Sequence, residues 1–220
     1  MKRIKIALLL LLWGGILFAQ EQKPDFWDDI EAFKKQDSAA FPPKNAILFI
    51  GSSSFTMWTD VQQYFPGYKI INRGFGGSAL PDQIRYFNEI VLPYKPKQIF
   101  IYCGENDIAG SDTINGDDVA NRFFKLFSLI RNKFPRVQIT YISMKPSPSR
   151  QLLLPKMIRG NELIKKYLAS KKRTAYIDVY KEMIDDEGKP RPDLFLDDNL
   201  HMNKTGYAIW KKMIEPHLLK

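Results

Sequence analysis

The chain alternates between short apolar runs and longer segments in which apolar residues recur at helical spacing. The short runs predict buried strands, and the longer segments predict amphipathic helices. Strands are expected at residues 46–50, 69–72, 98–102, 138–142 and 175–179. Helices are expected at residues 29–36, 57–65, 80–91, 117–134, 156–171 and 204–218. Because strands that alternate with helices form βαβ units, the pattern predicts an α/β fold whose parallel sheet is covered on both faces.

Glycine-rich and polar segments follow the first three predicted strands. They are GSSS at 51–54, GFGGS at 74–78 and GEND at 104–107. In parallel sheets, ligands bind at the carboxyl ends of the strands, so these three segments are expected to form one site. A small-residue turn that carries hydroxyls can present a nucleophile there. The adjacent hydroxyls of residues 52, 53 and 54 leave the choice of nucleophile open.

A histidine and an aspartate near the last predicted helix could activate such a hydroxyl. His201 follows Asp198 by three residues. A carboxylate at this spacing can fix the imidazole tautomer while the other ring nitrogen faces a hydroxyl. Asp197 is a rival for this role, but the three-residue spacing favours Asp198. The other histidine, His217, is predicted to be an ordinary surface residue.

Acyl transfer also needs hydrogen-bond donors for the negative charge that develops on the substrate oxygen. Gly77 can bring its backbone N–H close to a ligand because it lacks a Cβ atom. Asn106 can add a side-chain amide. A tight turn and a helix cap are the alternative roles of these residues. Their occurrence together at predicted strand ends favours a functional site.

Four segments in order resemble the sequence blocks of the SGNH (GDSL-type) hydrolase superfamily. They are GSSS at 51–54, NRGFGGS at 72–78, GEND at 104–107 and DNLH at 198–201. The first two are particularly similar to the platelet-activating-factor acetylhydrolase-like branch. The resemblance spans residues 47–207 and implies a flavodoxin-like three-layer α/β/α sandwich with a five-stranded parallel sheet. It also implies ester hydrolysis through an acyl-enzyme, without a metal or organic cofactor.

The resemblance assigns a role to five residues. Ser53 is the implied nucleophile, His201 the general base and then acid, and Asp198 the orienting carboxylate. The implied oxyanion donors are the backbone N–H groups of Ser53 and Gly77 and the side chain of Asn106.

This sequence departs from the family pattern at one position of the first block. Ser52 stands where the family usually has an aspartate. Because many members vary at this position, activity is still expected.

Composition narrows the function classes. With 220 residues and 45% hydrophobic content, the chain is expected to form one domain. The formal charge of +9 comes from dispersed basic residues without a nucleic-acid motif, so no nucleic-acid partner is expected. Two distant histidines and the single Cys103 do not provide a zinc site. Cys103, Trp58 and Trp210 are expected in the core. In the basic loop 145–150, Lys145 and Arg150 could contact substrate, but a solvated loop is the expected alternative.

Residues 1–20 have the features of a signal peptide: a basic start, an apolar run at 6–12 and a cleavage zone at 18–20. An N-terminal membrane anchor is the alternative. It is disfavoured because glycines at 14–15 break an apolar run that is short for a span of about 20 residues. The mature SGNH hydrolase domain is then residues 21–220, exported to a bacterial periplasm or cell exterior, with no stable membrane span.

The sequence therefore predicts an exported serine esterase that acts on a short-chain ester of a small molecule or a glycan, with acetyl as the expected acyl group. A lysophospholipase or thioesterase for longer acyl chains is the alternative within enzymes. A non-catalytic glycan-binding module on the same fold is the alternative outside them.

Overall fold

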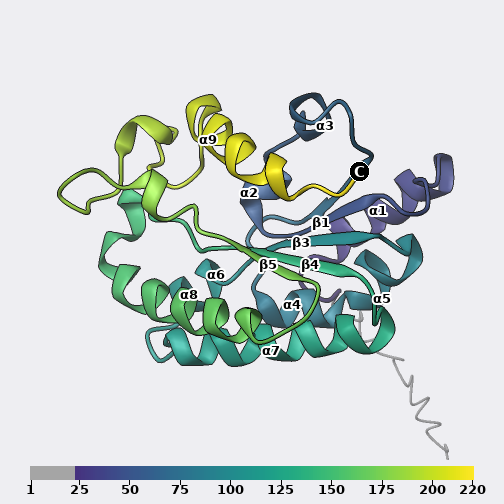
Figure 1. Cartoon of the computed structure of the whole chain (residues 1–220), viewed down its shortest axis with the longest axis horizontal. Coiled ribbons are helices and arrows are strands. Elements are labelled where there is room, and N and C mark those ends of the chain that lie inside the picture. Colours follow the sequence, from purple (N-terminus) through teal and green to yellow (C-terminus); the bar gives the residue numbers. More distant parts are fainter. Residues whose placement is uncertain (1–22) are drawn as a thin grey trace, which may run out of the picture.

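The centre of the computed structural model, which describes residues 23–220, is one sheet of five parallel strands (Figure 1). The strands are β1 (Ile47–Gly51), β2 (Ile70–Gly74), β3 (Gln98–Tyr102), β4 (Gln138–Ile142) and β5 (Thr174–Ile177). They lie in the order β2-β1-β3-β4-β5, and each neighbouring pair is parallel. This is the strand order of flavodoxin-like folds, so the predicted fold class is confirmed. The predicted signal peptide lies outside the described residues.

Helices pack on both faces of the sheet (Figure 1). One apolar cluster includes residues of α1 (Trp27–Ala39), α4 (Leu80–Arg85), α5 (Phe87–Ile90), α6 (Glu105–Ala109), α7 (Gly116–Lys133) and α8 (Leu154–Ala169). The opposite cluster includes residues of α2 (Ser53–Thr56), α3 (Val61–Tyr64) and α9 (Lys204–Ile214). Short 3₁₀ helices are η1 (Leu92–Tyr94), η2 (Pro148–Leu153), η3 (Lys181–Met183), η4 (Pro192–Leu194) and η5 (Glu215–His217). Within residues 23–220, no helix is long and apolar enough to span a membrane.

Alternate residues of β1 pack against opposite helical layers. Leu48 and Ile50 belong to one apolar cluster, and Ile47 and Phe49 belong to the other. All four side chains are fully buried. A strand that is covered on both faces needs apolar side chains on both. This explains why the strand shows no polar alternation in the sequence.

Two segments that were each predicted as one helix are interrupted. Within residues 57–65, helix begins only at Val61, because the chain first turns to bury Trp58 completely. Within residues 80–91, Tyr86 adopts a non-helical conformation (φ −95°, ψ 16°) and separates α4 from α5. Its hydroxyl donates a hydrogen bond to the Asp25 carbonyl oxygen at 2.6 Å. In both segments, a tertiary contact of an aromatic side chain overrides the local helical pattern.

The predicted environments of four other residues are confirmed. Trp58 and Trp210 are fully buried, and their ring centroids lie 6.3 Å apart in an edge-to-face arrangement. Cys103 is buried, and desolvation raises the pKa of its thiol. His217 is exposed near the C-terminus.

Candidate active site

The three glycine-rich or polar segments that follow β1, β2 and β3 meet at the carboxyl ends of these strands, as the sequence predicts. Gly51, the last residue of β1, pairs with Gly74 of β2 and with Tyr102 of β3. The three strands therefore end at the same level. Because all strands are parallel, the segments that follow them emerge on the same side.

Gly51 makes the turn between β1 and α2 possible. Its φ angle is +143°, and a Cβ atom at this position would lie 1.9 Å from the Tyr102 carbonyl oxygen. Only glycine fits this conformation and this close approach. The chain can therefore leave the sheet sharply and begin α2 at Ser53.

The three adjacent serines lie in different environments. Ser52 is 6% exposed, and its hydroxyl accepts a hydrogen bond from Asn106 Nδ2 at 2.7 Å. Ser54 is 1% exposed, and its Oγ atom has no hydrogen-bond partner among the described residues. Ser53 is half-buried, so its side chain reaches solvent. Since a substrate must reach the nucleophile, the geometry favours Ser53 over its two neighbours.

Two backbone N–H groups beside Ser53 are free to bind an oxyanion. Ser53 is the first residue of α2, so its own N–H has no acceptor within the helix. The N–H of Gly77 (φ +81°) makes no hydrogen bond to any of residues 23–220. A Cβ atom built on the adjacent Gly76 would lie 3.9 Å from Ser53 Cβ, which places this glycine turn next to the serine.

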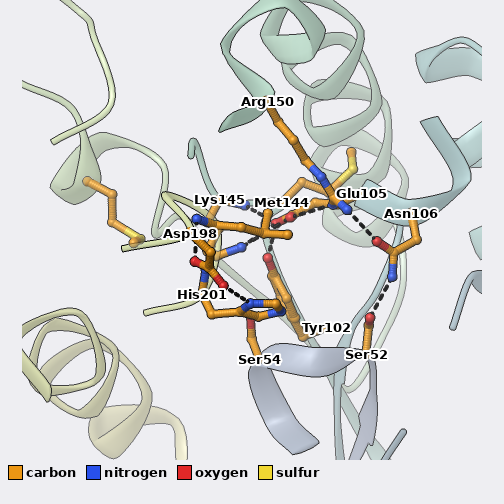
Figure 2. Close-up of polar contacts among 12 residues, drawn as sticks. Ser52, Ser54, Tyr102, Glu105, Asn106, Met144, Lys145, Arg150, Asp198 and His201 are labelled. Atoms are coloured by element: carbon orange, nitrogen blue, oxygen red, sulfur yellow. Dashed lines mark hydrogen bonds and ion pairs between the residues drawn. The ribbon is translucent and has the colours of Figure 1, made fainter. Parts of the chain in front are cut away.

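Asn106 lies on α6 and points toward the start of α2 (Figure 2). Its Nδ2 donates to Ser52 Oγ at 2.7 Å and to the Ser78 carbonyl oxygen at 3.0 Å. Its Oδ1 accepts from Arg150 Nη2 at 2.7 Å. Both Nδ2 hydrogens are thus engaged. A substrate oxyanion could use this amide by replacing Ser52 Oγ as one acceptor.

His201 is oriented by Asp198. His201 Nδ1 lies 2.6 Å from Asp198 Oδ2. Figure 2 marks this contact with a dashed line. Asp198 Oδ1 also accepts hydrogen bonds from the backbone N–H groups of Leu200 and His201, each at 2.9 Å. Asp197 makes no contact of this kind with the imidazole within the described part of the chain. The three-residue spacing therefore corresponds to a direct carboxylate–imidazole contact.

These contacts keep Asp198 ionised. Desolvation raises the pKa of the Asp198 carboxyl. The hydrogen bonds from the His201 backbone, the His201 ring and the Leu200 backbone outweigh it and lower that pKa to about 2. A carboxylate at neutral pH can hold the proton of His201 on Nδ1 and leave Nε2 to act as a base.

The His201 segment is also tied to α2. Tyr207 of α9 donates its hydroxyl hydrogen bond to the Ser54 carbonyl oxygen at 2.9 Å. No hydrogen bond joins His201 to Ser53 within residues 23–220. Hydrogen bonds between a catalytic base and its nucleophile are often long without substrate and tighten when it binds.

The prediction that loop 145–150 is a solvated basic loop is wrong. The Lys145 side chain is 2% exposed, and its Nζ lies 3.1 Å from Glu105 Oε2. Arg150 Nη1 also contacts Glu105 Oε2 at 3.1 Å, and the Tyr102 hydroxyl donates to Glu105 Oε1. Burial lowers the pKa of Lys145, while the adjacent Glu105 carboxylate opposes this shift. The loop turns inward because Glu105, on α6, offers a buried negative charge to both basic residues.

Sequence reasoning missed Glu105 as part of the site. The signal was its place in GEND, directly before Asn106, combined with two basic residues after the fourth strand. Within residues 23–220, no group of three or more His, Cys, Asp or Glu side chains could hold a metal ion.

Comparison with known proteins places this architecture among related sequences and structures. The sequence matches the GDSL-like Lipase/Acylhydrolase family over residues 39–209. No curated protein matches the chain.

Solved structures share the fold. A protein from Streptococcus pneumoniae, provisionally described as a platelet activating factor, is 19% identical with a TM-score of 0.76 over 87% of this chain and 92% of that one. A provisionally assigned acylhydrolase from Bacteroides fragilis is 20% identical with a TM-score of 0.76 over 89% and 97%. A variant of an acetyl xylan esterase from Geobacillus stearothermophilus is 15% identical with a TM-score of 0.62 over 81% and 99%.

Proposed function

The chain belongs to the GDSL-like lipase/acylhydrolase family, whose typical activity is ester hydrolysis, and we propose that it is a serine esterase that removes short acyl groups, acetyl above all, from small-molecule or glycan esters. The observation that carries the proposal is the arrangement at one sheet edge. The half-buried Ser53 follows β1, and Gly77, whose backbone N–H is free, follows β2. His201, oriented by the Asp198 carboxylate, follows β5 in a segment that the hydrogen bond from Tyr207 ties to α2.

In the proposed reaction, His201 Nε2 takes the proton of the Ser53 hydroxyl as Oγ attacks the ester carbonyl carbon. The carbonyl oxygen becomes an oxyanion and accepts hydrogen bonds from the N–H groups of Ser53 and Gly77 and from Asn106 Nδ2. When the tetrahedral intermediate collapses, His201 gives its proton to the leaving alcohol. A water molecule, deprotonated by His201 Nε2, then attacks the acyl carbon, and His201 returns the proton to Ser53 Oγ as the bond between Oγ and the acyl carbon breaks and the carboxylic acid leaves. Asp198 stabilises the imidazolium in both halves of the reaction.

The preference for a short acyl group follows from the polarity of the site. Ser52, Asn106 and His201 provide polar groups around the start of α2 (Figure 2). A long acyl chain would cover these polar atoms with methylene groups. The atoms would then lose hydrogen bonds to water without gaining new ones. An acetyl group needs little apolar surface. Resemblance of the fold to an acetyl xylan esterase supports a glycan ester as one substrate class.

One observation favours the alternative of longer acyl chains. Met57 and Leu196 are each 42% exposed, and they lie close in sequence to Ser53 and Asp198. Exposed apolar side chains on both of these segments could bind an extended acyl chain.

A chain-length series separates the two substrate classes. We expect p-nitrophenyl acetate to have the highest kcat/KM, with butyrate lower and octanoate lowest, because the site offers mainly polar contacts. Met57→Ser is the matched variant, and it is expected to leave acetate hydrolysis unchanged. Highest activity on octanoate that falls in the Met57→Ser variant would favour the lysophospholipase or thioesterase alternative. Glycan binding without hydrolysis of any ester would favour the binding module.

We also propose that the protein acts outside the cytoplasm. Support comes from the signal-peptide pattern of residues 1–20. After expression of the full chain in a bacterium, the periplasmic or culture fraction is expected to contain a protein whose intact mass lacks about the first 20 residues. Full-length protein confined to the membrane fraction would instead support the N-terminal anchor.

A further inference from the structure

We propose that Arg150 is a positioning residue that holds the Asn106 amide with Nδ2 toward the oxyanion site. The proposal rests on the proposed esterase function, because it concerns one of the oxyanion donors. Arg150 lies in η2 and reaches Asn106 on α6, as Figure 2 shows. Arg150 does not touch substrate and acts through Asn106.

The Asn106 amide can serve an oxyanion in only one of its two orientations. Rotation by 180° about the last side-chain bond exchanges Oδ1 and Nδ2. The exchanged amide would present oxygen lone pairs to the oxyanion, and the contact would change from attractive to repulsive. Correct catalysis therefore requires contacts that distinguish the two ends of the amide.

Two of the three contacts of the Asn106 amide make this distinction. Arg150 Nη2 can only donate, so the atom 2.7 Å from it must be Oδ1. The Ser78 carbonyl oxygen can only accept, so the atom 3.0 Å from it must be Nδ2. Ser52 Oγ can donate or accept and would tolerate either orientation. Without Arg150, only the contact with Ser78 would oppose the flipped amide.

The position of Arg150 is itself fixed by buried charge. Its Nη1 contacts Glu105 Oε2 at 3.1 Å while Nη2 contacts Asn106. Glu105 and Asn106 are consecutive residues of α6, so one planar guanidinium bridges both side chains. The Arg150 side chain is 16% exposed and that of Glu105 is 8% exposed. Lys145 Nζ contacts the same Oε2 atom of Glu105, also at 3.1 Å.

The loop that carries Arg150 is also bound to the segment that carries the catalytic histidine. The backbone N–H of Ser149 donates to the Asn199 carbonyl oxygen at 3.1 Å. Asn199 lies between Asp198 and His201. The η2 segment therefore joins the Asn106 side of the site to the histidine side, and this hydrogen bond helps to hold in place the segment that carries Arg150.

A double-mutant cycle tests the proposal. We expect Arg150→Ala to lower kcat for p-nitrophenyl acetate by about 10- to 100-fold with little change in KM, because a misoriented amide weakens only the transition state. Asn106→Ala is expected to lower kcat by about 10²- to 10³-fold. In the double variant, kcat should equal that of Asn106→Ala alone, because Arg150 then has no amide to orient. Arg150→Lys is expected to keep only part of the wild-type kcat, because a single ammonium nitrogen cannot replace the two separate guanidinium nitrogens that contact Glu105 and Asn106.

Arg122→Ala is the matched control. Arg122 of α7 pairs with the buried Asp107, the neighbour of Asn106 on α6, at 2.7 Å but does not contact Asn106. The Arg122→Ala substitution is expected to lower the melting temperature of the protein without lowering kcat. If Arg150→Ala has a melting temperature similar to that of Arg122→Ala but a lower kcat, the loss of kcat comes from the position of Asn106 and not from lower stability.

The proposal is overturned by losses of kcat that multiply in the double variant, since Arg150 would then act independently of Asn106. It is equally overturned if Arg150→Ala keeps full kcat while Asn106→Ala loses it, since the amide would then keep its orientation without the guanidinium. If Asn106→Ala keeps full kcat while Ser53→Ala is inactive, the esterase function stands and the positioning role fails. If the wild type hydrolyses no ester, the proposed function fails first and takes the positioning role with it.

Discussion

Replacement of Ser53 by alanine is expected to lower kcat for p-nitrophenyl acetate by on the order of 10⁴-fold or more, as removal of a serine nucleophile does in enzymes with this chemistry. Ser53 lies at the start of α2, where its hydroxyl reaches solvent and its side chain makes no hydrogen bond to other described residues. The substitution therefore removes the attacking oxygen without removing a contact that holds the fold. Unchanged thermal unfolding together with lost turnover is the combination to measure.

Ser52→Ala and Ser54→Ala are the matched controls for Ser53→Ala. Ser54 is too deeply buried to meet a substrate, and its replacement is expected to leave kcat nearly unchanged. Ser52→Ala removes one acceptor of Asn106 Nδ2 and leaves the contact with Ser78 in place. It is expected to lower kcat far less than Ser53→Ala. Wild-type turnover in Ser53→Ala, with loss in either neighbour, would show that the nucleophile is a different serine.

Replacement of Asp198 by asparagine is expected to lower kcat by about 10²- to 10⁴-fold. Asparagine can keep an oxygen for the backbone N–H groups of Leu200 and His201, so the turn should survive. Its neutral amide can no longer stabilise an imidazolium, and an amide N–H facing Nδ1 would favour the wrong tautomer. The KM value should change little, because the effect arises in the transition state.

The lowered pKa of Asp198 determines the pH range in which its charge supports activity. A carboxyl whose pKa is about 2 in the folded protein is ionised throughout the neutral and mildly acidic range. Its contribution to stability and to the orientation of His201 is present above the ordinary aspartate pKa and is lost as the pH falls toward 2. Asp198 should therefore add no ionisation of its own to the pH profile of wild-type kcat between about pH 5 and pH 8.

Asp197→Asn is the control for Asp198→Asn. The neighbouring carboxylate does not contact the imidazole in the described structure, so the substitution should leave kcat unchanged. A larger loss in Asp197→Asn than in Asp198→Asn would contradict the orientation of His201 by Asp198.

The sheet could be predicted from the sequence because its strands are buried on both faces. In β1, this burial leaves a continuous apolar run that ends at a glycine, and the run is visible without tertiary information. The helix boundaries at Val61 and Tyr86 were not predictable in the same way. They depend on where Trp58 and Tyr86 find partners in the folded chain, and the local helical pattern does not contain this information.

In the candidate site too, local contacts could be predicted from the sequence and long-range contacts could not. The contact between Asp198 and His201 is local, so a three-residue spacing was enough to predict it. The contacts of Glu105 with Lys145 and Arg150 join residues that are 40 and 45 positions apart. Charged residues in a loop usually face water, and only the folded structure shows that a buried carboxylate draws these two inward.

The central claim is that Ser53 is the residue that becomes acylated, and covalent labelling tests it most directly. The full protein would be treated with a fluorophosphonate, which reacts with an activated serine, and the labelled peptide would be identified by mass spectrometry. We predict one added phosphonyl group, located on Ser53, in the wild type and in Asp197→Asn, and slow or absent labelling in His201→Ala. Labelling of Ser52 or Ser54, or equally fast labelling of Ser53 without His201, would contradict this account of the site.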